Sequence, residues 1–187
     1  MKLSAGYLAG IRARAKLLHS EAEVEAALDR MAQAITVRLA DKDPIAICVM
    51  NGAVITAGKL LPRLDFPLRQ DYLHATRYRG ETRGGELNWL HRPEEKIEGE
   101  HLLIIDDILD EGVTLKAIVD ACWEGGAVAV DTAVLVEKQH TRSNGFEADF
   151  VGLKVEDRYL FGYGMDFKGY MRNAPGIFAV AETDLGG

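Results

Sequence analysis

Residues 101–115 of the chain read HLLIIDDILDEGVTL, and they are the most informative segment for predicting the fold. A continuous apolar run, residues 102–105, is typical of a strand buried on both faces of a parallel sheet. Two adjacent carboxylates, Asp106 and Asp107, follow it, and the spacing after them predicts a helix over residues 113–124. A buried strand, an acidic turn and a helix in this order are typical of an α/β protein.

The same alternation continues on both sides of this stretch. Helices are predicted over residues 20–39 and 53–64, and Ser20 with Glu23 forms a capping-box pattern at the start of the first. Strands or extended segments are predicted at 45–50, 68–78, 88–90, 127–136, 150–155 and 177–181. We therefore expect one α/β domain over residues 1–187, a mainly parallel sheet flanked by helices. Its ends, about residues 1–20 and 155–187, are expected to pair as a small hood.

Charge and composition exclude several classes of protein. The 187 residues carry 22 Lys and Arg against 29 Asp and Glu, a net charge of −7, which argues against a general nucleic-acid or anionic-membrane binder. Cys48 and Cys122 lie far apart, and the histidines show no zinc-site spacing. No signal-peptide pattern and no membrane-length apolar run is found, so a cytoplasmic protein is expected.

The turn after the acidic strand can hold a phosphorylated sugar. Gly112 allows a close backbone approach, and Thr114 adds a hydroxyl where the helix begins, so this turn can cradle a phosphate. Asp106 and Asp107 would repel a phosphate unless they bind something else. Carboxylates accept hydrogen bonds from a ribose diol and are ligands of Mg²⁺. A ligand with a sugar, phosphates and magnesium therefore accounts for the whole segment.

Other interpretations of the segment remain open at this point. The two adjacent acids could belong to a solvated turn, and Asp110 could simply cap the helix. The Walker pattern is absent, and Gly162 and Gly164 are followed by Phe167 where a dinucleotide fingerprint needs a third glycine. A response-regulator receiver would carry its acid pair near the N-terminus instead.

The run LLIIDDILDEGVTL resembles the phosphoribosyl-diphosphate binding motif of type I phosphoribosyltransferases. Three further segments resemble the hypoxanthine-guanine branch of that family: VMNGAVITAGKL, LVEK and DFVGLKVEDRYLFGYGMDFKGYMRN. The resemblance implies the type I phosphoribosyltransferase fold and a purine salvage enzyme. Such an enzyme converts hypoxanthine or guanine and phosphoribosyl diphosphate into IMP or GMP and pyrophosphate, with Mg²⁺.

The resemblance also implies roles for particular residues. Asp110 corresponds to the acid that faces nitrogen seven of the purine, the general base. The resemblance places three residues at the purine. Lys138 would donate to its 6-oxo oxygen, Tyr159 would stack on its ring, and Leu160 would contact its edge through the backbone. Phosphoribosyl diphosphate is expected at Asn51, Gly52, Asp106, Asp107, Glu111, Gly112, Val113, Thr114 and Arg172. The metal is expected at Asp106, Asp107 and Asp166.

Each single residue also has a plain structural interpretation. Lys138 could be a surface cation, Tyr159 a core aromatic, and Asp166 and Arg172 could pair with each other. The order and spacing of these residues after the acidic motif favour the functional interpretation.

Two further segments match the family with departures from its pattern. The loop at Met50 and Asn51 matches a place where the family uses a non-proline cis peptide, which we predict here; the family usually has a basic residue at the position of Asn51. A flexible loop is expected from Arg77 and Tyr78 onward, where the family often has serine before the tyrosine. Asp106 stands where many purine enzymes have glutamate.

The resemblance further implies small-molecule substrates and a homodimer or homotetramer, with no nucleic acid or membrane as partner. The alternative is a regulatory protein of the same fold that senses phosphoribosyl diphosphate or nucleotides and binds RNA or DNA. Such a regulator should show a basic face, which the net charge of −7 disfavours. A pyrimidine-type transferase is a third interpretation, and Lys138 with the Tyr159 region favours an oxopurine instead.

Overall fold

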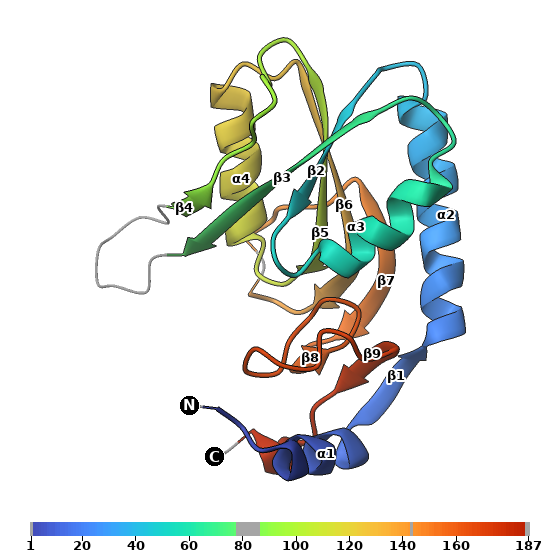
Figure 1. The fold of residues 1–187 in the computed structure, drawn as a ribbon, viewed down its shortest axis with the longest axis vertical. Helices are drawn as coiled ribbons and strands as arrows, with labels where there is room; N and C mark the ends of the chain where they lie inside the picture. The colour runs from blue at the N-terminus through green and yellow to red at the C-terminus, as the bar shows by residue number, and fades with distance from the viewer. Residues whose placement is uncertain (1, 78–86, 143, 186–187) are drawn as a thin grey trace.

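A six-stranded sheet forms the larger part of the molecule (Figure 1). The structure, a computed structural model, describes residues 2–77, 87–142 and 144–185. The strand order is β4-β3-β2-β5-β6-β7, and β4 alone runs antiparallel to its neighbour among these strands. The strands are β2 (Ile45–Val49), β3 (Arg69–Arg77), β4 (Leu87–His91), β5 (His101–Leu109), β6 (Ala129–Gln139) and β7 (Phe150–Glu156). The predicted mainly parallel α/β sheet is confirmed.

Helices cover both faces of this sheet, and alternate residues of β5 serve the two faces. Leu103 and Ile105 belong to a core cluster with α2 (Glu21–Leu39) and α3 (Val54–Leu60). Leu102 and Ile104 belong to a second cluster with α4 (Val113–Glu124). Successive side chains of a strand point to opposite faces, so a strand covered on both faces needs an unbroken apolar run. No helix of the described residues is both long and apolar enough to cross a bilayer.

The helix boundaries follow local signals in the sequence. Ser20 caps α2, and Ser20 and Glu23 form the predicted capping box with reciprocal hydrogen bonds. The helix expected over residues 53–64 is shorter: α3 ends at Leu60 and continues as a 3₁₀ turn, η1 (Leu61–Arg63). Pro62 lies in that turn, and a proline cannot donate the backbone hydrogen bond that would continue the α-helix.

A second, small sheet is built from the two ends of the chain. It has the order β1-β9-β8, formed by β1 (Lys16–Ser20), β8 (Leu160–Phe161) and β9 (Gly176–Ala179). We call these three strands the small sheet. It lies below the carboxyl edge of the large sheet in Figure 1, beside α1 (Ala5–Arg14). A third core cluster holds Ile11 of α1 against residues of this region, and Arg14 pairs with Asp184 in the 3₁₀ turn η2 (Glu182–Asp184).

A partly buried charge network ties α2 and α3 to the segment after β8. The Tyr163 hydroxyl donates to Glu25 Oε1 at 2.6 Å, and Lys59 Nζ donates to the same oxygen at 2.6 Å. Arg63 donates to the other oxygen of Glu25. Burial raises the pKa of Glu25, but the hydrogen bonds from these three side chains outweigh it and lower that pKa to about 2. The ionised carboxylate of Glu25 therefore stabilises this junction.

Replacing Glu25 by Gln is expected to lower the free energy of unfolding at neutral pH by about 2 kcal/mol, because the negative charge and one of the two acceptor oxygens are lost while two cations remain beside the amide. The pKa of Glu25 lies below its unfolded value, so the stabilisation is complete above pH of about 4.3. It is lost as the pH falls toward about 2. Thermal unfolding of both proteins across this range should show the difference shrinking.

Glu21→Gln is the matched control, since Glu21 lies on the same helix and its carboxylate is 3.9 Å from Lys59. An exposed pair of this kind contributes less than about 1 kcal/mol. Equal destabilisation by both substitutions would contradict the role given to Glu25.

Candidate active site

A pocket of about 500 Å³ opens between the carboxyl edge of the large sheet and the segment that follows β7. Strands β2, β5 and β6 are parallel, so their carboxyl ends meet at this edge, which is where α/β proteins bind ligands. The pocket is lined by Val49, Met50, Asn51, Gly52, His74, Thr76, Asp106, Asp107, Ile108, Asp110, Lys138, Tyr159, Leu160, Met165, Asp166 and Arg172. Ten residues of the predicted site therefore line one pocket: Asn51, Gly52, Asp106, Asp107, Asp110, Lys138, Tyr159, Leu160, Asp166 and Arg172.

The two adjacent carboxyl groups of β5 are buried at the floor of this pocket. Asp106 and Asp107 are 9% and 7% exposed, so they do not form a solvated turn. Burial, together with the charge of Asp107, raises the pKa of Asp106 well above its usual value. Burial also raises the pKa of Asp107, against the opposing charge of Arg172. Two buried acids with few compensating cations are the setting in which a bound cation is most favourable.

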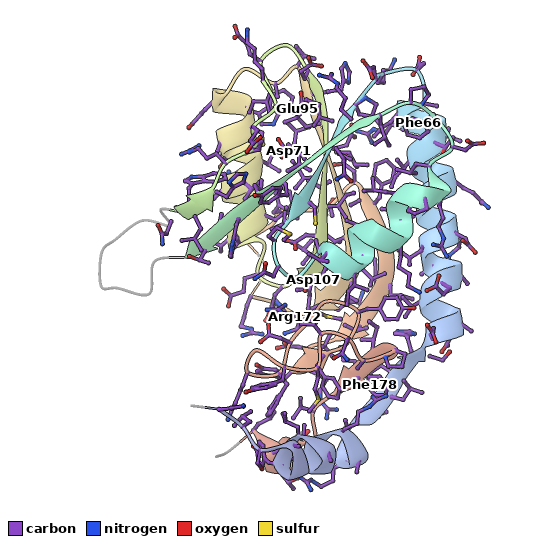
Figure 2. The ribbon with its side chains drawn as sticks, in the orientation of Figure 1. Phe66, Asp71, Glu95, Asp107, Arg172 and Phe178 are labelled. Carbon is purple, nitrogen blue, oxygen red and sulfur yellow. The ribbon has the colours of Figure 1, made fainter. Side chains whose placement is uncertain are left out.

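Three segments approach so closely around Asp107 that two of them need glycine. A Cβ on Gly52 would lie 2.4 Å from an Asp107 carboxylate oxygen. A Cβ on Gly164 would lie 2.0 Å from the carbonyl oxygen of Gly52, and Gly164 also has a φ of +107°. The peptide bond between Met50 and Asn51 is cis, which confirms the prediction for this loop. Figure 2 shows Asp107 and Arg172 at this junction between the large and small sheets.

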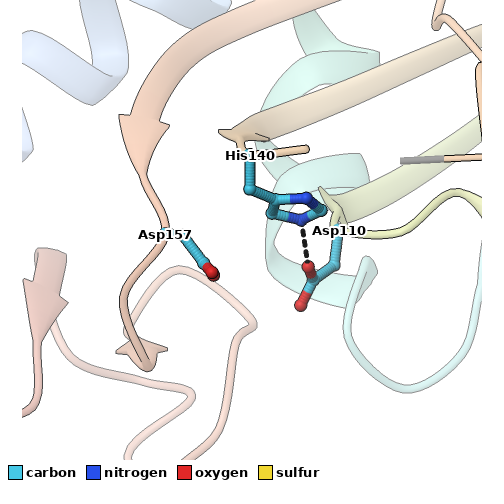
Figure 3. A group of neighbouring side chains, drawn as sticks. All are labelled: Asp110, His140 and Asp157. Carbon is cyan, nitrogen blue, oxygen red and sulfur yellow. Dashed lines mark hydrogen bonds and ion pairs between the residues drawn. The ribbon is translucent and has the colours of Figure 1, made fainter. Parts of the chain in front are cut away.

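Asp110 differs from the two buried acids because a lysine and a histidine are hydrogen-bonded to its carboxylate. Lys138 Nζ donates to Oδ2 at 2.8 Å, and His140 Nε2 lies 2.7 Å from Oδ1 (Figure 3). Burial raises the pKa of Asp110, but the hydrogen bonds from Lys138 and His140 outweigh it and lower that pKa. Lys138 is 11% exposed, so it is not a surface cation. The carboxylate of Asp110 is ionised and held on both oxygens.

Asp157 completes a group that has the spacing of a metal site. Ligand atoms of Asp110, His140 and Asp157 all lie within 4.8 Å of one another (Figure 3). Arg142 already donates to Asp157 at 2.6 Å, and Lys138 lies 3.7 Å from it. These two cations already compensate the carboxylates, so a metal ion would have to displace them. The buried acids of β5 fit a metal better.

The segment after β7 supplies the opposite wall of the pocket. Tyr159 is 40% exposed, lines the pocket and makes a T-shaped contact with Phe167, so it is not a core aromatic. Asp166 and Arg172 form an ion pair of 2.6 Å, as their plain structural interpretation predicted. The Gly169 N–H also donates to Asp166 at 2.6 Å, and Arg172 donates to the Gly164 carbonyl. The ion pair and these hydrogen bonds therefore hold this wall together from within the same segment.

The predicted phosphate turn, residues 111–114, follows β5 and includes the first two residues of α4. Gly112 has a φ of +81° and occupies the cap position of α4, where no side chain caps the helix. The interpretation of Asp110 as a helix cap is therefore wrong. Glu111, Gly112, Val113 and Thr114 are not among the residues that line the pocket, so the structure sets them beside it, at the start of α4.

The predicted loop lies mostly outside the described residues. Arg77 ends β3, and Tyr78 is not among the residues that the structure describes. His74 and Thr76 of β3 line the pocket, and sequence reasoning missed them, although their place near the carboxyl end of a parallel strand was a usable signal. It also missed His140, whose partner Asp110 is 30 residues away.

The close approach at Gly164 can be tested by Gly164→Ala. The added methyl group would overlap the Gly52 carbonyl, and alanine disfavours a positive φ, so the free energy of unfolding should fall by about 3 kcal/mol or more. Urea unfolding followed by circular dichroism measures this.

Gly58→Ala in α3 is the matched control, because a Cβ there meets nothing within 4 Å. It should leave stability unchanged or raise it by about 0.5–1 kcal/mol. Wild-type stability in Gly164→Ala would show that the two loops are not packed as described.

Known proteins resemble this chain over most of its length. A model of the family described as "Phosphoribosyl transferase domain" matches residues 15–168. The hypoxanthine-guanine-xanthine phosphoribosyltransferase of Tritrichomonas foetus is 31% identical over 169 residues, covering 90% of this chain and 92% of that protein. The hypoxanthine-guanine phosphoribosyltransferase of Bacillus subtilis (strain 168) is 32% identical, covering 87% and 91%. A solved hypoxanthine-guanine-xanthine phosphoribosyltransferase superposes with a TM-score of 0.81 at 29% identity, covering 89% of this chain and 97% of that one.

Proposed function

The chain belongs to the phosphoribosyl transferase domain family, in its hypoxanthine-guanine branch, and we propose that it is a purine salvage enzyme that joins hypoxanthine or guanine to the phosphoribosyl group of phosphoribosyl diphosphate. The products are IMP or GMP and pyrophosphate. One observation carries this proposal: a single pocket brings together the buried acids of β5, the ion-paired Asp110 and Lys138, and the exposed Tyr159.

Asp110 and Lys138 are the groups that act on the base. Nitrogen nine of the base forms its bond to the sugar carbon as the bond from that carbon to pyrophosphate breaks, and the electron pair leaves with pyrophosphate. Asp110 accepts the proton that nitrogen seven loses, since an ionised carboxylate within hydrogen-bond reach is a competent general base. Lys138 turns from Asp110 to the 6-oxo oxygen, Tyr159 stacks on the base, and Leu160 offers its backbone. A purine with an amino group at position six would present a hydrogen-bond donor to Lys138, which is itself a donor, so this hydrogen bond would be lost.

Asp106 and Asp107 would hold Mg²⁺ and, with it, the ribose hydroxyls. Their burial and raised pKa values support this assignment, because a divalent cation relieves the repulsion between two desolvated acids. When bound, the ion supplies positive charge beside the departing pyrophosphate. Asp166 is the third proposed ligand; both its oxygens are engaged by Arg172 and Gly169, so it would have to exchange these partners.

The loops around the pocket would bind the remaining phosphate groups. Residues 111–114 would hold the 5′-phosphate at the start of α4, where backbone amides and the helix dipole favour an anion. Asn51, Gly52 and Arg172 would contact pyrophosphate. The small sheet with its flanking segments, about residues 1–20 and 155–187, would act as a hood, and the loop from Arg77 and Tyr78 would close to exclude water.

We also propose a homodimer or homotetramer with small-molecule substrates only. A cytoplasmic location is supported by two free cysteines, Cys48 and Cys122. Burial raises the pKa of each thiol to about 11, which suits unreactive core thiols in a reducing compartment.

The decisive assay mixes the protein with Mg²⁺, phosphoribosyl diphosphate and one base, and follows absorbance. Turnover is expected with hypoxanthine or guanine and not with adenine or uracil. No turnover with either oxopurine would overturn the proposal, and binding of phosphoribosyl diphosphate without turnover of any base would favour a regulatory protein instead.

Asp110→Asn should lower kcat by about 10²- to 10⁴-fold, because the amide cannot accept the proton. Binding of phosphoribosyl diphosphate, measured by calorimetry, should change less than about twofold, since other groups hold that substrate. A kcat within twofold of wild type would refute the role of Asp110.

Lys138→Ala should raise KM for the oxopurine and weaken the preference for it over adenine, because the donor to the 6-oxo oxygen is gone. Competition between hypoxanthine and adenine measures the preference directly, and an unchanged ratio of kcat/KM values would contradict the assignment.

A further inference from the structure

His140 is a buried side chain behind the pocket that none of the roles above uses. It directly follows β6, and its side chain is 6% exposed. Asp110 and Lys138 line the pocket, whereas His140 is not among the lining residues. Any influence of this ring on a bound ligand therefore passes through a neighbour, and the pocket-lining residue to which it is hydrogen-bonded is Asp110 (Figure 3).

The hydrogen bonds of the ring determine which nitrogen carries its proton. The backbone N–H of Arg142 can only donate, and it lies 3.1 Å from Nδ1 of His140, so Nδ1 is an acceptor. A neutral imidazole whose Nδ1 accepts carries its proton on Nε2. Nε2 lies 2.7 Å from Oδ1 of Asp110, so the ring donates to that oxygen. The backbone after β6 thereby fixes a donor against Asp110.

The two oxygens of Asp110 consequently have partners of different kinds. Oδ2 accepts from Lys138, which lines the pocket and can turn to a ligand there. Oδ1 accepts from the buried ring of His140, which does not line the pocket, and Nη2 of Arg142 lies 4.0 Å from the same oxygen. When Lys138 turns to the 6-oxo oxygen of a base, Oδ2 is released and Oδ1 stays held. A carboxylate held at one oxygen keeps the other aimed in a fixed direction.

We propose that His140 is a positioning residue whose Nε2–H fixes Oδ1 of Asp110, so that Oδ2 is the atom that receives the proton from nitrogen seven of the base. This inference rests on the proposed function and deepens it. As the bond from nitrogen nine to the sugar carbon forms and pyrophosphate leaves with its electron pair, the proton of nitrogen seven passes to Oδ2. His140 gives up no proton in this step; it only limits rotation of the carboxylate.

Two substitutions of His140 distinguish the effect of its Nε2–H donor from the effect of the volume of its ring. His140→Phe keeps the volume and removes the donor, so kcat with hypoxanthine should fall by about 10- to 100-fold. KM for phosphoribosyl diphosphate should stay within about twofold, because His140 does not touch that site. His140→Gln can again place an N–H near Oδ1 and should recover kcat to within about threefold of wild type.

Gln139→Ala, at the exposed neighbouring position, is the matched control and should retain wild-type kcat. Wild-type kcat in His140→Phe would overturn the proposal. A kcat as low in His140→Gln as in His140→Phe, with both proteins folded, would also overturn it, because packing rather than the donor would then matter.

A spectroscopic measurement keeps the proposal testable if His140→Phe fails to fold. Ring ¹⁵N NMR of the wild-type protein, with the His140 signal assigned through its loss in His140→Gln, should show the tautomer protonated at Nε2. The tautomer protonated at Nδ1 would overturn the inference. A wild-type protein that shows the expected tautomer and turns over no oxopurine would refute the proposed function instead.

Discussion

Two neighbouring carboxyl groups are buried at the end of β5, and the architecture around the pocket depends on keeping them there. Burial raises the pKa of both Asp106 and Asp107, and the charge of Arg172 opposes the shift of Asp107. Arg172 can approach because the segment from Gly162 to Arg172 packs against the loop that contains Met50, Asn51 and Gly52. That approach in turn needs glycine at 52 and 164, where a Cβ would collide with Asp107 or with backbone. One desolvated pair thus constrains residues in two distant parts of the chain, the loop at Gly52 and the segment from Gly162 to Arg172.

Asp110, only three positions beyond this pair, has the opposite electrostatic environment. Its pKa is lowered because Lys138 and His140 donate to it, although burial acts in the other direction. The strand ends at Leu109, so Asp110 turns away from the buried floor toward the end of β6. A short sequence therefore carries acids suited to different tasks: a pair that favours a cation, and a single ionised carboxylate suited to accept a proton.

The sequence predicted the features that depend on local signals. The capping box at Ser20, the apolar runs of β2, β5 and β6, and the glycines that end α4 are all readable from neighbours along the chain. The motif order also pointed to the residues that line the pocket. The helix α1 was missed because Ile11 is its one buried residue, which leaves no apolar stripe to detect. β8 was missed because it is two residues long.

Contacts between distant residues could not be predicted in the same way. The hydrogen bond from Tyr163 to Glu25 joins residues 138 positions apart, and that from His140 to Asp110 joins residues 30 apart. Neither has a signature in its own segment: a tyrosine between two glycines and a histidine after a strand have many possible partners. Their partners are set by how the small sheet and the β6–β7 connection fold back, which is a property of the whole tertiary structure.

The pairing of β1 with β9 has a consequence for how the molecule is made on the ribosome. β1 leaves the ribosome before every strand of the large sheet, yet its partner β9 follows all of them in the chain. The large sheet can assemble while β1 still lacks its neighbour, with Leu17 and the other residues of that strand exposed to unrelated chains. Closing the small sheet is therefore a late step of biogenesis, and nascent chains that stall before residue 176 would present an unpaired strand to chaperones.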